Sequence, residues 1–153
     1  MSDTPEAHGL GQRGRVDPAL RRWKLLFRAW LLLTLVLLLS SGDMLRQMQL
    51  RLLFWLPLDR MSDEIFGLGL ADKAVHLFLF AVMGALATRV WWGRAAYPRI
   101  MLALVLLGAG TEIAQYFIPG RGASIGDFAV DSLGLLLGFW FTRRYWLRAL
   151  AAA

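Results

Sequence analysis

Residues 100–118 read IMLALVLLGAGTEIAQYFI, nineteen residues with a single charged side chain, that of Glu112. An α-helix needs about twenty predominantly apolar residues to cross the hydrocarbon core of a bilayer. Two comparable stretches, 74–92 and 125–142, lie on either side, and residues 25–41 form a shorter one near the N-terminus. Because an open strand would leave backbone groups unpaired in lipid, we expect each stretch to be a helix.

The composition agrees with a membrane protein. Hydrophobic residues make up 58% of the 153 residues, against about 45–50% in soluble domains. Cysteine is absent, which excludes disulfides, thiolate zinc sites and cysteine nucleophiles. The net charge is +6, but the basic residues lie between apolar stretches rather than on a polar surface, so we expect no nucleic-acid partner.

We therefore predict an all-α membrane protein with about four transmembrane helices. The predicted divisions are a disordered basic tail at 1–24, a first transmembrane helix at 25–41, an outer loop at 42–72 with an interfacial segment at Leu52–Leu56, and a core at 73–148 with spans at about 74–92, 100–118 and 125–142. A cleaved signal peptide is the alternative for the first span, but its apolar stretch exceeds the usual 7–15 residues.

The distribution of Lys and Arg predicts the orientation. Twelve of these residues flank one side: Arg13, Arg15, Arg21, Arg22, Lys24, Arg28, Arg89, Arg94, Arg99, Arg143, Arg144 and Arg148. Five flank the other side: Arg46, Arg51, Arg60, Lys73 and Arg121. Cytoplasmic loops carry the excess of positive charge. We predict that both termini are cytoplasmic, in an inner membrane, and that the 43–72 and 119–127 loops face outward.

Polar residues gather at the predicted outer ends of three helices. Asp72 and His76 are four residues apart on one helical face, as are Asp127 and Asp131, and Glu112 shares a face with Gln115. A carboxylate in a span costs about 2.5–3.5 kcal/mol on insertion scales. Glu112 and Asp131 are therefore expected to turn inward, toward partners among Lys73, His76 and Arg121. A structural ion-pair network and an outward-facing polar pocket both stay open.

Local structure offers simpler explanations for some of these residues. Ser124 and Asp127 fit an S-x-x-D capping box, and Asp72 could cap the second span. Lys73 could extend its charge to the interface. Five glycines (Gly84, Gly108, Gly110, Gly134 and Gly138) are interpreted as close-packing positions, the last two in a GxxxG spacing, and Trp91, Trp92, Trp140 and Trp146 as a cytoplasmic aromatic belt.

Two ordered motifs resemble the VanZ-like family over about residues 70–142. They are D-K-x-x-H from Asp72 to His76 and E-x-x-Q-x-x-x-P-G-R-x-x-S-x-x-D-x-x-x-D from Glu112 to Asp131. The sequence departs from the family at Thr111, where an acidic residue is common, and at Phe80, where an aromatic hydroxyl is common. The resemblance implies a bacterial envelope membrane protein, in a family named after an accessory protein associated with resistance to the glycopeptide teicoplanin.

Our leading hypothesis is a membrane accessory protein with a pocket for a polar or phosphate head group of a lipid or cell-wall precursor. Arg121, beside the N-terminus of the last span, would attract the anion. The predicted binding residues are Asp72, Lys73, His76, Glu112, Gln115, Arg121, Ser124, Asp127 and Asp131. The expected partners are membrane lipids, a cell-wall precursor or glycopeptide, and a second copy of the chain.

Two further functions stay open. A membrane enzyme would use Glu112, His76 and Asp131 for acid–base chemistry on a lipid-linked substrate, although no nucleophile motif is present. Histidine with carboxylates could hold a divalent metal, but the sequence lacks a close pair of histidines, so we expect no metal or cofactor. A small transporter or flippase would need several copies of the chain.

Overall fold

The computed structural model describes residues 17–44, 47 and 70–151. These residues form helices α1 (Pro18–Leu38), α4 (Leu70–Trp91), α5 (Tyr97–Gln115) and α6 (Ile125–Ala151), and this described part contains no strand. The all-α fold class is therefore confirmed. The interfacial segment predicted at Leu52–Leu56 and residues 1–16 of the predicted tail lie outside the described residues.

Three helices are long and apolar enough to cross a membrane: α4, α5 and the Ile125–Trp146 part of α6. Large apolar side chains that face away from the bundle, such as Phe78, Leu106 and Leu136, are exposed, as expected for helix surfaces in contact with lipid. Helix α1 is not among these candidate spans because its first half carries four basic residues, Arg21, Arg22, Lys24 and Arg28. A fourth span stays a prediction.

Helix α1 begins earlier than predicted. Asp17 is its N-cap and accepts a hydrogen bond from the amide of Ala19 at 2.9 Å, and Pro18 occupies the first turn. An Asp cap followed by Pro is a strong start signal, because the Asp side chain accepts from an orphan amide of the first turn and Pro has no amide hydrogen to leave unpaired. Residues 18–24 are therefore helical, and the prediction of a disordered tail was wrong for them.

The predicted ends of two spans also shift. Helix α5 ends at Gln115, three residues before the predicted end at 118, and a turn over residues 116–120 follows it. Helix α6 continues to Ala151, past the predicted end at 142. Glu112 consequently lies only about 4.5 Å, or one turn, from the end of its helix.

Helices α4 and α6 form the most extensive contact of the fold, and glycines make it possible. A Cβ atom on Gly84 would lie 2.5 Å from the carbonyl oxygen of Leu135, and one on Gly134 would lie 2.7 Å from that of Leu77. Gly138 faces the Ala81 carbonyl even more closely. The GxxxG interpretation is confirmed, whereas a Cβ on Gly110 would meet none of the described residues within 4 Å, so Gly110 is not a packing position among them.

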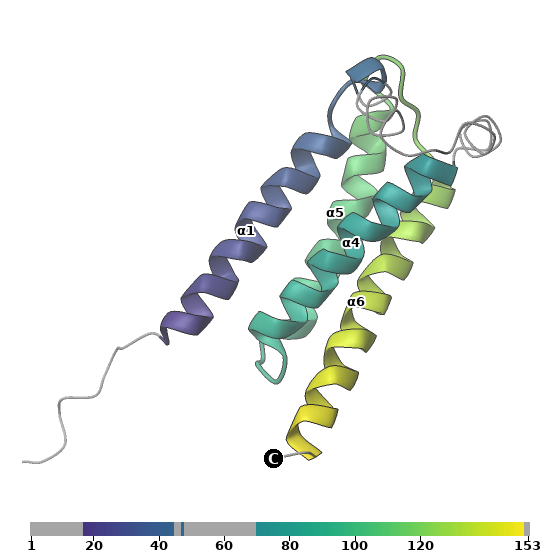
Figure 1. Ribbon diagram of the computed structural model, residues 1–153. Helices are drawn as coiled ribbons and strands as arrows, with labels where there is room; N and C mark the ends of the chain where they lie inside the picture. The colour runs from purple at the N-terminus through teal and green to yellow at the C-terminus, as the bar shows by residue number, and fades with distance from the viewer. Residues whose placement is uncertain (1–16, 45–46, 48–69, 152–153) are drawn as a thin grey trace, which may run out of the picture.

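The two ends of the bundle differ in character (Figure 1). One end gathers the N-termini of α4 and α6 with the C-termini of α1 and α5. At the other end, the guanidinium of Arg89 lies 5.2 Å from the ring centre of Trp23 and 4.9 Å from that of Trp146. Arg144 stacks in the same way on Trp140 at 5.2 Å. Arginine and tryptophan thus mark one end, and the predicted polar residues lie at the other.

Candidate functional site

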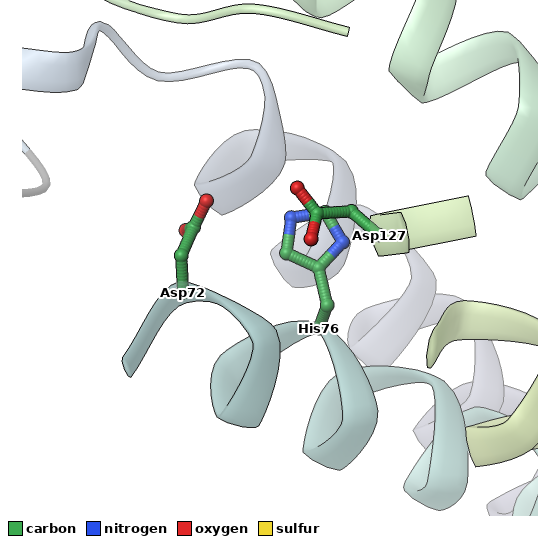
Figure 2. A group of neighbouring side chains, drawn as sticks. All are labelled: Asp72, His76 and Asp127. Carbon is green, nitrogen blue, oxygen red and sulfur yellow. The ribbon is translucent and has the colours of Figure 1, made fainter. Parts of the chain in front are cut away.

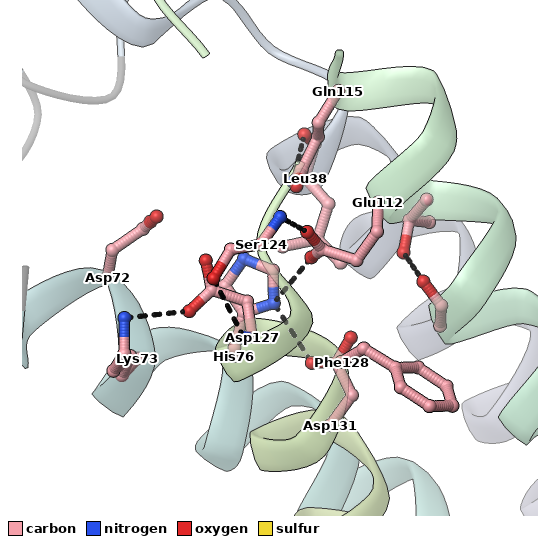
Figure 3. A network of polar contacts seen from close by, with 12 residues as sticks. Leu38, Asp72, Lys73, His76, Glu112, Gln115, Ser124, Asp127, Phe128 and Asp131 are labelled. Atoms are coloured by element: carbon pink, nitrogen blue, oxygen red, sulfur yellow. Dashed lines mark hydrogen bonds and ion pairs between the residues drawn. The ribbon is translucent and has the colours of Figure 1, made fainter. Parts of the chain in front are cut away.

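His76 lies at the centre of the polar end of the bundle. Its side chain is 0% exposed, and its Nδ1 atom is 2.9 Å from Oδ1 of Asp131 and 3.9 Å from Oε1 of Glu112 (Figure 3). Each of these residues comes from a different helix, α4, α6 and α5 respectively. Asp131 and Glu112 are only 1% and 5% exposed. The three helices therefore meet through one buried histidine and two buried carboxylates.

The start of α6 connects this buried group to the α5–α6 loop. The hydroxyl of Ser124 accepts a hydrogen bond from the amide of Asp127 at 3.2 Å, which confirms the predicted cap. The amide of Ser124 donates to Oε2 of Glu112 at 2.7 Å. In a capping box the acidic residue three positions on accepts that amide. Here Glu112 of the neighbouring helix takes its place, and the positive end of α6 favours the Glu112 charge.

A tight turn places Arg121 beside the same helix end. The amide of Arg121 donates to the carbonyl of Ile118 at 3.1 Å, and Gly120 has a φ of 75°. Pro119 followed by a glycine of positive φ is the signature of a type II turn. The side chain of Arg121 is only 7% exposed, and its Nη1 atom lies 3.7 Å from Oδ1 of Asp72.

Lys73 pairs with the second carboxylate of α6. Its Nζ atom is 3.1 Å from Oδ1 of Asp127. Asp72, His76 and Asp127 each place a ligand atom within 4.8 Å of the other two (Figure 2). Eight predicted residues are therefore connected, and we call them the polar cluster: Asp72, Lys73, His76, Glu112, Arg121, Ser124, Asp127 and Asp131.

One sequence interpretation changes, and one predicted binding residue has a structural contact. Asp72 lies in the first turn of α4, after two helical residues, so it does not cap that helix. Gln115, predicted as a binding residue, donates through Nε2 to the backbone carbonyl of Leu38 at 2.9 Å (Figure 3). This bond ties α5 to the end of α1, because an unpaired carbonyl is costly to bury.

Gly108 belongs to the site although it was interpreted only as a packing glycine. A Cβ atom at this position would lie 3.3 Å from Oδ2 of Asp131. Gly108 therefore leaves room for the Asp131 carboxylate. Its spacing from Glu112, four residues along α5, is the signal that could have indicated this role, since i and i+4 share a helical face.

Several buried polar atoms of the cluster have no hydrogen-bond partner in the part of the chain that the structure describes. They are His76 Nε2, Glu112 Oε1, Arg121 Nη2, Asp131 Oδ2 and Asp127 Oδ1, the last of which forms the ion pair with Lys73. Buried polar atoms are nearly always paired with protein, water or a ligand. His76, Glu112 and Asp131 also place one ligand atom each within 4.8 Å of the others. The cluster can therefore accept a polar ligand or a cation.

A family comparison agrees with the ordered motifs. The family model described as VanZ/LLP1 matches residues 25–148, which covers most of the chain. The chain belongs to the VanZ/LLP1 family. The match includes most of α1, so it extends further toward the N-terminus than the resemblance inferred from residues 70–142. No curated protein and no solved structure matches this VanZ/LLP1 protein significantly. Family membership and three apolar helices together identify a VanZ-type membrane protein.

Proposed function

We propose that this VanZ/LLP1 protein is a bacterial envelope accessory protein whose polar cluster binds a phosphate-bearing head group of a lipid or cell-wall precursor. The observation that carries the proposal is Arg121. Its guanidinium is buried, it reaches Asp72 only at 3.7 Å, and its Nη2 atom has no hydrogen-bond partner among the described residues. A planar guanidinium with free donors matches the oxygens of a phosphate.

The surroundings of Arg121 favour an anion. The N-terminus of α6 begins at Ile125, four residues after Arg121, and a helix N-terminus attracts negative charge. The Nζ atom of Lys73 provides a second cation, at 38% side-chain exposure and hence accessible. Asp72 and Asp127 hold these two cations in place. His76 offers an unpaired Nε2 to a hydroxyl or phosphate oxygen.

The charge distribution supports an outward-facing cluster. Arg89, Arg143 and Arg144 lie among the tryptophans at the opposite end of the bundle. Tryptophan belts mark membrane interfaces, and an excess of positive residues is typical of the cytoplasmic one. The polar cluster would then lie in the outer leaflet of the bacterial inner membrane, where lipid-linked cell-wall precursors are used.

The proposal is tested by lipid extraction. The full chain is purified in mild detergent with its native lipids, and bound lipids are identified by mass spectrometry. We expect a phosphate-bearing lipid in about one copy per chain, reduced at least tenfold in Arg121→Ala and unchanged in Arg94→Ala, which removes an exposed arginine near the opposite end. Equal lipid content in all three proteins, with Arg121→Ala folded, contradicts the proposal.

The His76–Asp131 pair favours a second candidate function, a membrane enzyme acting on a lipid-linked substrate. A carboxylate on one ring nitrogen fixes the tautomer and leaves the other nitrogen for proton transfer. The geometry matches, since Asp131 is 2.9 Å from Nδ1 and Nε2 has no partner among the described residues. If the wild-type protein converts the extracted lipid chemically and His76→Gln does not, this candidate is supported over simple binding.

A further inference from the structure

The carboxylates of the polar cluster outnumber its fixed cations. Asp72 pairs with Arg121 and Asp127 pairs with Lys73. This leaves the buried carboxylates of Glu112 and Asp131 with His76 as their only basic neighbour within 4 Å among the described residues. A protonated His76 would offset one negative charge and a neutral His76 none. At least one further positive charge is needed, because an uncompensated buried charge is strongly destabilising.

The geometry of these three residues fits a metal ion. Two ligands that bind one ion at about 2.0–2.2 Å lie roughly 3–4 Å from each other. The Nδ1 atom of His76 is 2.9 Å from Asp131 Oδ1 and 3.9 Å from Glu112 Oε1. One ligand atom from each residue lies within 4.8 Å of the other two, and all three side chains are buried.

Within the described residues, each of the two carboxylates also keeps one oxygen available to an ion. Glu112 Oε1, which faces His76, and Asp131 Oδ2 have no hydrogen-bond partner in the described part of the chain. The other oxygen of Glu112 is held by the amide of Ser124 at 2.7 Å, the kind of outer contact that orients a metal-binding carboxylate.

We infer that His76, Glu112 and Asp131 bind one divalent transition-metal ion, of the Mn²⁺ or Zn²⁺ type. Two carboxylates offset the charge of the ion, and the imidazole nitrogen favours a transition metal over Mg²⁺. Three protein ligands leave further coordination positions open, as at sites that also bind a substrate oxygen. The inference goes beyond head-group binding, because none of the three ligands is Arg121 or Lys73.

The test uses the full chain purified without a histidine tag and carrying His8→Ala, so that His76 is its only histidine. After treatment with EDTA, Mn²⁺, Zn²⁺ or Mg²⁺ is added, and bound metal is measured by equilibrium dialysis and elemental analysis. We expect about one Mn²⁺ or Zn²⁺ per chain and much weaker binding of Mg²⁺. Failure to bind either transition metal overturns the inference and leaves protons as the compensating charge.

Variants locate the ion. Glu112→Gln and Asp131→Asn should weaken Mn²⁺ binding at least tenfold. Asp43→Asn, which removes an exposed carboxylate outside the cluster, is the matched control and should bind like wild type. Arg121→Ala should keep the ion while losing the lipid, which separates this inference from the proposed function. Loss of Mn²⁺ binding in Asp127→Asn but not in Glu112→Gln would place the ion elsewhere and overturn the inference.

A spectroscopic measurement tests the site without any substitution of the proposed ligands. Pulsed electron paramagnetic resonance of the Mn²⁺ complex in the His8→Ala chain should show modulation from one imidazole nitrogen. Bound Mn²⁺ without a nitrogen signal would contradict ligation by His76.

Discussion

Ser124 serves two helices through two different atoms. Its amide donates to Glu112 of α5, and its hydroxyl accepts from the amide of Asp127 in α6. Substitution can remove only the hydroxyl. We expect Ser124→Ala to lower the free energy of unfolding by about 1 kcal/mol through loss of the cap, as measured by denaturant unfolding in detergent.

Ser132 is the matched control for this change. Its hydroxyl bonds to the Phe128 carbonyl within α6 at 3.0 Å, a contact that contributes little to helix stability. Ser132→Ala should therefore change the unfolding free energy by less than about 0.5 kcal/mol. Equal effects of the two substitutions would contradict the capping role of Ser124.

Gln115 acts as a connection between helices. Its Nε2 atom donates to the carbonyl of Leu38, and the side chain is buried. Gln115→Leu leaves that carbonyl unpaired at a cost of about 1–3 kcal/mol. We expect faster hydrogen exchange of the amides near the end of α1 and unchanged lipid content. Loss of bound lipid with no change in amide hydrogen exchange would instead support the binding role that is predicted for Gln115 from the sequence.

At the scale of helices, the contact between α4 and α6 brings His76 to Asp131. Gly134 permits the close approach, since a Cβ there would lie 2.7 Å from the Leu77 carbonyl. We expect Gly134→Leu to separate the helices and to destabilise the protein by about 1–3 kcal/mol or more. Thermal unfolding measures the effect, and Gly110→Leu, at a position where no atom of the described residues lies within 4 Å of a Cβ, should change the stability little. A similar loss in both variants contradicts the packing argument.

The sequence was sufficient for the helical class and for the end of the bundle at which polar residues meet. The length of the apolar stretches predicted the helical class. The i,i+4 spacing of Asp72 with His76 and of Asp127 with Asp131 predicted the end at which polar residues meet. The contact partner of each polar side chain could not be derived from spacing. Whether Glu112 meets a cation or the Ser124 amide depends on helix rotation and on the loop turn, which periodicity does not determine. Gly108 was missed for the same reason, because its neighbour Asp131 comes from another helix.

At the scale of the whole molecule, the proposed head-group binding requires the polar cluster to face outward. The chain has no cysteine, so single cysteines report position without background. Gly122→Cys, at an exposed position where a Cβ meets none of the described residues within 4 Å, should react with a membrane-impermeant maleimide in intact cells. Arg94→Cys near the opposite end should react only after permeabilisation. The reverse pattern would invert the topology.

The most direct test of head-group binding measures the distance between Arg121 and a lipid phosphorus. The protein, labelled with ¹⁵N in its arginine guanidinium groups, is placed in bilayers containing the co-purified lipid, and ³¹P–¹⁵N dipolar dephasing is recorded by solid-state NMR. We expect a strongly dephased guanidinium signal that disappears in Arg121→Lys and persists in Arg94→Lys. Identical dephasing in wild type and Arg121→Lys would show that Arg121 does not hold a phosphate head group.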